Sequence, residues 1–454
     1  MKILLTVHQF FPDFSAGTEV LTLSVARTLR DRGHEVRVFT GYPQTSRISD
    51  TERFDRYEYD GIPVGRFRHD RVAIGGQHSV MEMEYDNRLV AKHFRALLTE
   101  FRPTVVHFFH LQGLSASPID ECLSARVPTV LTPTDFWFVC PTVKLQLPDG
   151  SDCDGPDSDS LNCIRHLVSL TQPVAVRIAV AAAPNALLGL LVKTACATRP
   201  VSARAVGDLC ALRSRHAFLT TRLKQIDFIM APTRLIQRLL LREGAAQQCV
   251  ALCRYGVEVP SVVRPRVQHS GSLVIAFIGT LANQKGAHVA IGAIRRLAPE
   301  ANVRLDLYGK QGEFPDYQRQ LEALAAGDAR IRFLGTFPNA RIGVVLAGID
   351  LLVVPSVWRE NTPLVVYSAQ AAGCPVIGSD VEGIAEIIEH ERNGLLFPAG
   401  DADALARAIG RVVNDRSLLA RLSAAADTPK TISEYVDEAE RVYGNVLARR
   451  KAAV

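Results

Sequence analysis

The chain has 454 residues, too many for one typical hydrophobic core, so we expect two domains of ordinary size. Its net charge of +5 is mildly basic, and no dense basic run with interleaved aromatic residues occurs, so nucleic acid is not an expected partner. Nine cysteines, an odd number scattered through the chain, indicate reduced thiols in a cytosol.

The first forty residues predict a β-α-β unit. The apolar run Ile3 to Val7 indicates a strand and is too short for a signal peptide, so we expect a cytoplasmic protein. A helix follows with Leu21, Val25 and Leu29 on one face, and Gly33 ends it. Later elements of this half are strands at Val36–Thr40, Val105–Phe109, Val130–Thr132 and Ile226–Ala231, and a helix near Leu235–Arg242.

An insertion of about residues 150–220 interrupts this half and contains the uncharged segment Ile178 to Val192. Fifteen residues with Pro184 inside are too few to span a bilayer. Two interpretations stay open for this segment, a packed helical insertion and a helix that docks at a membrane interface.

The second half predicts another doubly wound α/β domain. A stretch rich in Pro, Ser and Gly marks a linker at residues 257–272, between a first domain of residues 1–256 and a second of residues 273–428. The second domain contains the short β-rich runs "LVIAFIGT", "VRLDLYG", "IRFLG", "LLVVPS" and "PVIGSD". Residues 429–454 predict one amphipathic helix, which we expect to return to the first domain.

The stretch from Leu351 to Asp380 reads as strand, loop, helix and strand. Its apolar runs, Leu351–Val354 and Pro375–Ile377, predict strands buried on both faces. Between them Thr362 can cap a helix that has Pro363 as its first residue, continues through Leu364 to Ala372 and ends at Gly373.

Glu360 lies in the loop of this unit. Ligands of parallel sheets bind beyond the carboxyl ends of the strands, so we expect Glu360 to face a ligand cleft. The alternative is a solvated carboxylate beside a helix N-terminus.

The segment "GTLANQKG", Gly279 to Gly286, follows a predicted strand and places Lys285 at a helix start, where its charge can act on phosphate oxygens. Together with the helix at Thr362, this lysine predicts a diphosphate site. Neither half contains G-x-G-x-x-G, so a dinucleotide enzyme is not favoured.

Five segments carry a more specific signal: "FPDFSAGTEVLTLSVARTLRDRGHEV", "VVHFFHLQGL", "LTPTDFWFVCP", "GTLANQKG" and "PSVWRENTPLVVYSAQAAGCPVIGSDVEG". Together they resemble the GT-B glycosyltransferases of retaining family 4, also called group 1, over nearly the whole chain. The resemblance implies two Rossmann-like domains that face a central cleft. It implies transfer of a hexose-type sugar from a nucleoside-diphosphate sugar to an acceptor hydroxyl, with no cofactor or metal.

The implied setting is cell-envelope or exopolysaccharide assembly. The implied partners are the nucleotide-sugar donor, a carbohydrate or lipid-linked acceptor, and a membrane surface on whose inner face the protein would be peripheral.

The resemblance also assigns site residues. The catalytic candidates are Glu360, as the first carboxylate of an E-x7-E motif that binds donor-sugar hydroxyls, with His110 and Asp135. The candidates for donor binding are Gly17, Thr280, Lys285, Asn361, Thr362, Pro363, Leu364, Ser368 and Glu386. His107 is a second histidine candidate. For both His107 and His110, a purely structural role in the core is an equal alternative. For Asp135, the alternative is a role in a turn or as a helix cap.

Departures from the family pattern keep rivals open. Ser368 stands where the second glutamate is expected, Thr280 replaces the usual arginine, Ala16 replaces a second glycine, and Thr134 replaces a histidine. A sugar-nucleotide epimerase and a silent sugar-nucleotide-binding subunit therefore remain alternatives.

No catalytic metal is expected, because no Asp-x-Asp is seen at a strand end. A zinc site at Cys140, Cys153, Cys163 and His166 is a lesser alternative, since the spacing lacks paired C-x2-C.

Overall fold

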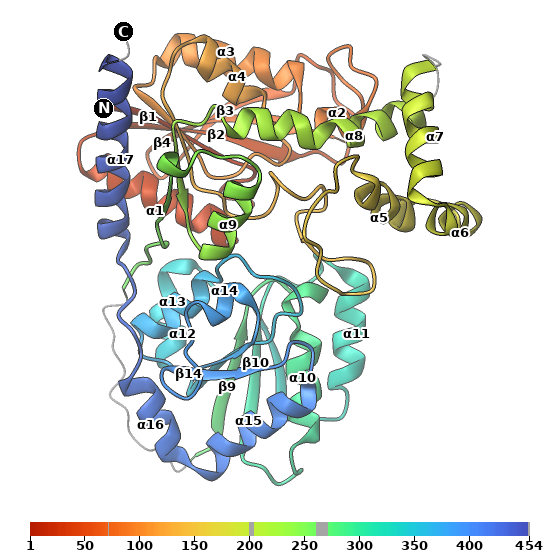
Figure 1. Cartoon of the computed structure of the whole chain (residues 1–454). Helices are drawn as coiled ribbons and strands as arrows, with labels where there is room; N and C mark the ends of the chain where they lie inside the picture. Colours follow the sequence, from red (N-terminus) through yellow and green to blue (C-terminus); the bar gives the residue numbers. More distant parts are fainter. Residues whose placement is uncertain (71, 199–203, 260–270, 453–454) are drawn as a thin grey trace. The chain divides into compact units, whose positions relative to one another are not determined.

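The computed structural model describes residues 1–70, 72–198, 204–259 and 271–452, and most of the predicted linker lies outside these ranges. The chain forms two compact units (Figure 1). Unit 1 comprises Met1–Cys253 with Val436–Val454, and unit 2 comprises Arg254–Tyr435. Each contains a mostly or fully parallel sheet covered by helices, which confirms the prediction of two Rossmann-like α/β domains.

Unit 1 contains an eight-stranded sheet of order β3-β4-β2-β1-β5-β6-β7-β8. All neighbours pair in parallel except β3 and β4, which form an antiparallel hairpin at one edge. The strands are β1 (Lys2–Val7), β2 (Glu35–Pro43), β3 (Phe54–Tyr59), β4 (Ile62–His69), β5 (Val105–Phe108), β6 (Thr129–Leu131), β7 (Phe228–Ala231) and β8 (Val250–Leu252). The predicted strands of this half are confirmed, whereas β3, β4 and β8 were not predicted.

The helices of unit 1 bury apolar faces against this sheet. In α1 (Gly17–Asp31), Leu21, Val25 and Leu29 are buried together as predicted. The other helices outside the insertion are α2 (Val80–Met83), α3 (Arg88–Phe101), α4 (Ser117–Ser124) and α9 (Arg234–Arg242). Phenylalanines of β2, β4, α3 and β5 are among the largest fully buried side chains of this core.

The predicted C-terminal amphipathic helix is α17 (Ile432–Ala452). Its apolar face is buried, and the hydroxyl of Tyr443 lies 2.7 Å from Nδ1 of His107 in β5. Near the end of the helix, Arg450 forms a two-point ion pair with Asp227, at 2.8 and 2.9 Å. These contacts hold most of α17 in unit 1, far along the chain from the strands that it covers.

Unit 2 contains a fully parallel six-stranded sheet of order β11-β10-β9-β12-β13-β14, the 3-2-1-4-5-6 order of a doubly wound fold. The strands are β9 (Leu273–Ile278), β10 (Val303–Tyr308), β11 (Ile331–Gly335), β12 (Leu351–Val354), β13 (Val376–Ser379) and β14 (Gly394–Phe397). The helices are α10 (Ala287–Arg296), α11 (Pro315–Ala325), α12 (Ile342–Ala347), α13 (Leu364–Ala371), α14 (Glu382–Ala385), α15 (Ala402–Asn414) and α16 (Arg416–Ala424). Five of these strands were predicted, and β14 was not.

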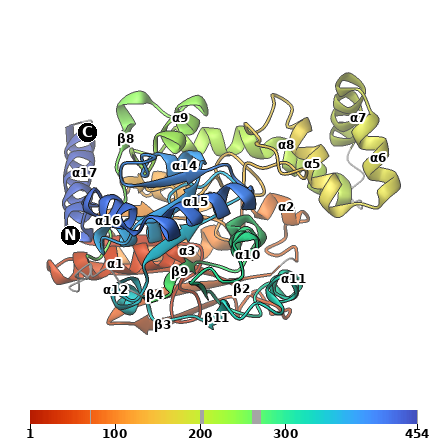
Figure 2. The same ribbon diagram turned by 90° about the horizontal axis from the view of Figure 1, so that it is seen from below.

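The insertion in unit 1 forms α5 (Leu161–Thr171), α6 (Val174–Ala182), α7 (Asn185–Thr198) and α8 (Arg204–Leu223). In both ribbon views α6 and α7 lie on the side of unit 1 away from α17 (Figures 1 and 2). The inner face of α7 is packed, with Leu188 and Val192 buried. Helix α6 buries no residue fully and packs against the small core of the insertion only through the partly buried Val180.

The cysteine prediction was wrong for one pair. Cys196 in α7 and Cys210 in α8 form a disulfide, with their Cα atoms 5.5 Å apart. Their separation of 14 residues gave no sequence signal of this contact, because it depends on how the two helices fold back on each other. The other seven cysteines form no disulfide.

Candidate active site

Two loops of unit 2 interlock at the carboxyl ends of neighbouring strands, one after β9 and one after β12. Gly286 has φ of +73°, and a Cβ atom there would lie 1.8 Å from the carbonyl oxygen of Pro355. The backbone N–H of Val357 also donates to the carbonyl of Gln284 at 3.0 Å. Only glycine fits at this crossing, so the predicted phosphate loop is held against the loop that contains Glu360.

Lys285 and Glu360, which belong to these two loops, form an ion pair with Nζ 2.7 Å from Oε1. The same oxygen accepts hydrogen bonds from Ser356 Oγ at 2.6 Å and from Trp358 Nε1 at 2.9 Å. The Glu360 side chain is 5% exposed and that of Lys285 29%. The alternative of a solvated carboxylate is therefore wrong, because three donors offset the cost of burying the charge.

All three donors contact Oε1 of Glu360, and among the described residues no hydrogen bond ends on Oε2. An ionised carboxylate accepts bonds at both oxygens. The arrangement therefore fixes the carboxylate through one oxygen and leaves the other available to a hydroxyl of a ligand.

The residues after Glu360 differ from the predicted helix start. The hydroxyl of Thr362 donates to the carbonyl of Asn361 at 2.8 Å and does not cap the helix. Helix α13 begins at Leu364, with Pro363 as its N-cap in an extended conformation. The prediction of a Thr362 cap was wrong because the backbone at Pro363, with ψ of 109°, is not yet helical. Asn361 instead donates to the hydroxyl of Tyr255 at 3.1 Å.

Two glycines complete this part of the site. Gly373, with φ of +64°, follows the end of α13 as predicted. Gly383 in α14 lies so close to the site loop that a Cβ atom would be 2.1 Å from the carbonyl oxygen of Glu360. The backbone of Glu360 is therefore supported directly by α14.

Three other donor-binding candidates lie in unit 2 without contacting Glu360 through a hydrogen bond. The hydroxyl of Ser368 donates to the carbonyl of Leu364 at 3.2 Å, within α13. Thr280 is half-buried after β9, and its carbonyl accepts a bond from the N–H of Ala282 at 2.8 Å. Glu386 is half-buried at the end of α14. Their roles toward a donor stay predictions.

In unit 1, His110 and Asp135 are hydrogen-bonded through Nε2 and Oδ2. His110 follows β5 and Asp135 follows β6, so both lie at the carboxyl ends of parallel strands. The other carboxylate oxygen of Asp135 accepts the backbone N–H of Trp137 at 2.9 Å. One oxygen of Asp135, Oδ1, thus has the turn role that was the alternative, while the other, Oδ2, orients the buried His110.

Sequence reasoning missed His8 and Glu19, which extend this cluster. The ring of His8, just after β1, lies 4.1 Å from that of His110, and its Nε2 is 3.3 Å from Oε1 of Glu19. Burial, then the neighbouring His110 and His69, hold the pKa of His8 well below its usual value. A histidine directly after the first strand was the available signal. Gly17, the first residue of α1, is exposed two positions before Glu19.

His107 is a core histidine. It is fully buried, and its ring nitrogens lie 2.7 Å from the hydroxyl of Tyr443 and 2.8 Å from that of Thr132. Burial lowers its pKa to about 3. These contacts fasten α17 to the sheet and leave His110 as the histidine of the candidate site.

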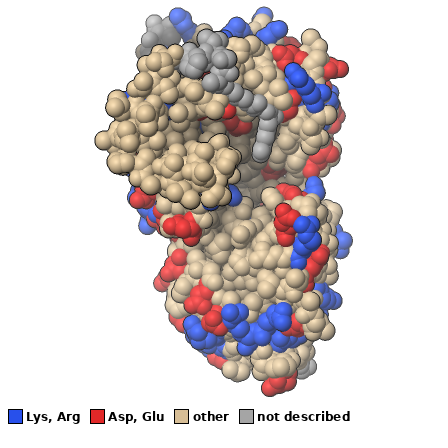
Figure 3. Space-filling view, turned by 90° about the vertical axis from the view of Figure 1, so that its right-hand side faces the viewer, with Lys and Arg blue, Asp and Glu red and all other residues tan. Residues whose placement is uncertain are grey.

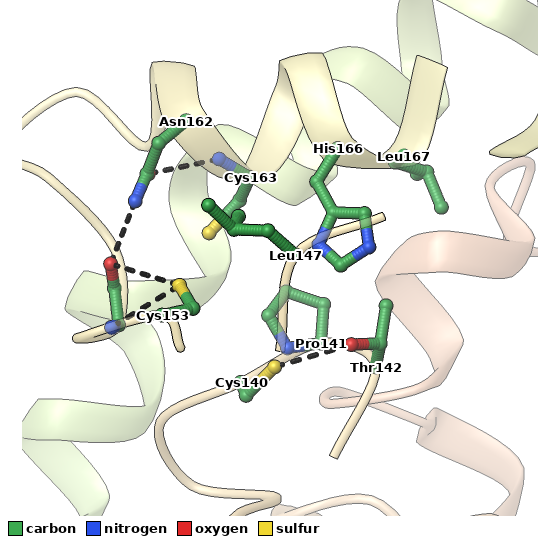
Figure 4. Close-up of a pocket in the computed structure, with 10 residues that line it drawn as sticks. Cys140, Pro141, Thr142, Leu147, Cys153, Asn162, Cys163, His166 and Leu167 are labelled. Carbon is green, nitrogen blue, oxygen red and sulfur yellow. Dashed lines mark hydrogen bonds between the residues drawn. The ribbon is translucent and has the colours of Figure 1, made fainter. Parts of the chain in front are cut away.

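The zinc alternative concerned a small cavity lined by Cys140, Cys153, Cys163 and His166 (Figure 4). Burial raises the pKa of the Cys163 thiol to about 12, with smaller contributions from Cys140 and Cys153. Within the described ranges, no group of three or more His, Cys, Asp or Glu side chains is arranged to hold a metal ion. The geometry therefore gives the zinc alternative no support.

Comparisons with known proteins agree with this architecture. The family "Glycosyl transferases group 1" matches residues 272–415, and "Glycosyl transferase 4-like domain" matches residues 16–156, together more than half of the chain. A curated relative, the uncharacterized glycosyltransferase MJ1607 of Methanocaldococcus jannaschii, is 33% identical over 142 residues, covering 31% of this chain and 36% of its own length.

Another relative, the amylovoran biosynthesis glycosyltransferase AmsK of Erwinia amylovora, is 30% identical over 198 residues, covering 41% of this chain and 48% of its own length. Both matches thus span less than half of the relative. Among solved structures, Anabaena Alr3699/HepE in complex with UDP and glucose is similar in fold, with a TM-score of 0.63, 17% identity and coverage of 98% of this chain and 99% of its own. The chain belongs to the group 1, family 4 glycosyltransferases and has the GT-B fold.

Proposed function

We propose that this protein is a metal-independent, retaining glycosyltransferase that moves a hexose-type sugar from a nucleoside-diphosphate sugar to an acceptor hydroxyl. The observation that carries the proposal is the ion pair of the partly exposed Lys285 with the buried Glu360, at the carboxyl ends of β9 and β12. A cation suits the diphosphate of a donor, and the available oxygen of Glu360 suits a sugar hydroxyl. The Anabaena relative in fold is described with UDP and glucose, which supports this class of donor.

In the proposed reaction, the bond between the anomeric carbon and the leaving diphosphate breaks while a bond to the acceptor oxygen forms on the same face. The acceptor proton passes to the leaving phosphate oxygen, so no protein nucleophile is required. Lys285 and the N-terminus of α13 stabilise the negative charge that develops on the diphosphate. Glu360 holds the sugar ring through a hydroxyl group.

The proposal assigns the other candidates by unit. In unit 2, Thr280, Asn361, Thr362, Pro363, Leu364, Ser368 and Glu386 line the donor site. In unit 1, the candidates taken from the family resemblance are Gly17, for the diphosphate, and His110 and Asp135, for the sugars. Because the pKa of His8 is lowered, this ring stays neutral beside His110 and adds no positive charge to the cluster.

The proposed setting is cell-envelope or exopolysaccharide assembly, with a carbohydrate or lipid-linked acceptor at the inner face of the membrane. The relatives support it by what they are called, since AmsK is named for amylovoran biosynthesis and LpsE of Rhizobium meliloti for lipopolysaccharide core biosynthesis.

Calorimetric titration with nucleoside diphosphates tests the donor site. Lys285→Ala should weaken binding of the preferred diphosphate, by roughly 1.5–3 kcal/mol for a lost charge-assisted contact. Arg407→Ala removes an exposed cation of α15 in the same unit and serves as the control, with affinity unchanged. Equal affinity in Lys285→Ala and the parent would show that the phosphate loop has another role.

The replacements Thr280 and Ser368 favour one rival, a silent sugar-nucleotide-binding subunit, because each exchanges an expected charge for a hydroxyl. Incubation with a panel of donors distinguishes it. A transferase slowly releases the nucleoside diphosphate, a silent subunit binds the donor and releases none, and an epimerase returns an isomeric donor.

A further inference from the structure

The insertion of unit 1 concentrates exposed apolar side chains. Fourteen large hydrophobic residues are exposed in the described part of the chain, and half of them lie within residues 170–191. The seven are Leu170, Val174, Val176, Ile178, Leu187, Leu190 and Leu191. Monomeric soluble proteins rarely expose a contiguous apolar surface of this kind, so the cluster indicates a binding surface.

Figure 3 shows a broad tan surface without blue or red atoms on the upper lobe of the face that lies to the right in Figure 1, where α6 and α7 are found. Elsewhere on the same face, acidic and basic atoms are mixed. The exposed apolar side chains of α6 and α7 therefore lie in a region of this face that shows almost no charged atoms.

The helices that carry this surface are held in a defined arrangement. Arg165 of α5 donates to the carbonyl of Ala181 at 3.0 Å and to Asn185 Oδ1 at 2.9 Å, and so bridges the end of α6 and the start of α7. The disulfide between Cys196 and Cys210 joins α7 to α8. A small core of Leu161, Ile164, Leu188, Val192 and Leu212 packs beneath α7. The exposed apolar residues therefore belong to helices that are held in place by specific contacts, and their exposure is not the result of local unfolding.

The charge pattern around the surface is one-sided. Between Asp159 and Asp208 the sequence contains no Asp or Glu, whereas it contains basic residues that include Arg177 and Lys193. Both are exposed next to the apolar residues, and Lys193 also pairs with Asp159 at 3.2 Å. An apolar segment that itself carries basic and no acidic residues complements an anionic lipid surface.

The composition of this surface differs from that of a protein interface core. Residues 167–198 contain no Phe, Tyr or Trp, and the exposed side chains are Leu, Ile and Val. Cores of protein interfaces are enriched in aromatic residues, which this surface lacks.

The geometry indicates how deep such a contact would reach. Within the described residues no single helix is long and apolar enough to cross a membrane, and α6 and α7 satisfy the length and composition criteria only as a pair bent by 116°. A helix of 14 residues is about 21 Å long, against about 30 Å of hydrocarbon in a bilayer. A bent pair of this size suits the interface, where apolar faces reach about 5–10 Å into the lipid.

We propose that α6 and the outward face of α7 insert into the interfacial layer of an anionic lipid bilayer and hold unit 1 at the membrane surface. The inner-membrane setting is taken from the proposed function, whereas the test measures lipid binding and requires no sugar transfer.

Vesicle sedimentation of the full chain tests the proposal, with phosphatidylcholine vesicles that do or do not contain phosphatidylglycerol. The parent should sediment with the anionic vesicles, and less so in high salt. The double variant Ile178→Asp with Leu190→Asp should lose about tenfold or more in partitioning, because burying even one such side chain contributes about that factor. Its melting temperature should match the parent, since both residues are more than half exposed.

Val344→Asp with Phe314→Asp is the matched control, because both side chains are exposed apolar residues of unit 2. It should sediment like the parent. Equal sedimentation of the Ile178 and Leu190 variant and the parent, or a parent that stays in solution, would overturn the proposal. So would sedimentation velocity showing a dimer that the Ile178 and Leu190 variant dissociates, since a second copy would then cover the surface. A parent that binds vesicles but transfers no sugar would count against the proposed function alone.

Discussion

Replacement of Glu360 by glutamine tests the centre of the candidate site with almost no change of shape. In the structure Oε1 of Glu360 accepts bonds from Lys285, Ser356 and Trp358 at 2.6–2.9 Å. Glutamine retains one carbonyl oxygen in reach of these donors but loses the negative charge, and it turns an N–H donor group toward the position of Oε2. The fold should persist, since the backbone around Glu360 is held by Gly383 and by the contact of Gly286 with Pro355.

The structure sets the magnitude of the loss. Charge-assisted hydrogen bonds contribute roughly 1.5–3 kcal/mol, and neutral ones roughly 0.5–1.5 kcal/mol. Because the three donors share one oxygen and Lys285 is partly exposed, we expect a total stability loss of about 2 kcal/mol rather than the sum over three bonds. For a domain the size of unit 2, this corresponds to a decrease in melting temperature of roughly 4–8 °C.

Turnover should change in a different way from binding. Loss of a charge-assisted bond to a donor-sugar hydroxyl lowers kcat/KM by roughly 10- to 150-fold. Affinity for the free nucleoside diphosphate should stay the same or increase, because it carries no sugar and Lys285 is released from its carboxylate partner.

Thermal melting, calorimetry with nucleoside diphosphates and donor turnover are measured on Glu360→Gln and on the control Glu389→Gln. Glu389 is an exposed carboxylate of unit 2 paired with Arg392, so the control should melt within about 1–2 °C of the parent. Equal melting of the two variants would refute the stabilising role of the pair, and unchanged turnover of Glu360→Gln would refute the donor-sugar assignment.

Two further predictions concern stability. Gly286→Ala should destabilise unit 2 by more than about 3 kcal/mol in urea unfolding, because its Cβ would lie 1.8 Å from the Pro355 carbonyl oxygen at φ of +73°. The control Gly410→Ala in α15, where a Cβ would meet nothing within 4 Å, should be neutral or stabilising, and equal effects of the two substitutions would contradict the close approach of Gly286 to Pro355. His107 has a folded-state pKa of about 3, below the value near 6.5 of an unfolded histidine, so the unfolded chain binds more protons between these values and stability falls as pH decreases from 6.5. His107→Gln should flatten this dependence by up to about 1.4 kcal/mol per pH unit, and parallel urea-derived curves for variant and parent would contradict the burial of a neutral ring.

The elements that were predicted correctly have strong local patterns. Strands β12 and β13 are four-residue runs that are buried throughout; Pro355 follows the first and Pro375 precedes the second. The hairpin of β3 and β4 was missed although Asp60 and Gly61 form its turn with positive φ. Strand β3 alternates charged and aromatic residues that are half-buried or exposed, so no apolar run marks it.

For the candidate site, the sequence indicated the positions of individual residues but not the contacts between them. The positions of Lys285 and Glu360 after strands indicated a ligand site, but their ion pair joins residues 75 positions apart, and a local pattern cannot specify it. The same holds for the crossing of Gly286 and Pro355, which depends on β9 and β12 being neighbours in the sheet. His8 and Glu19 were missed because each is a single polar residue, and only the fold places them beside His110.

The contact between Lys285 and Glu360 also bears on the two departures from the family pattern. With Thr280 and Ser368 in place of charged residues, the electrostatic part of the proposed donor binding would fall more heavily on this pair. In the proposed donor complex, a diphosphate would compete with Glu360 for the ammonium group of Lys285, while Ser356 and Trp358 would still donate to the carboxylate. On this proposal, loss of Lys285 should affect nucleotide affinity before it affects the geometry of Glu360.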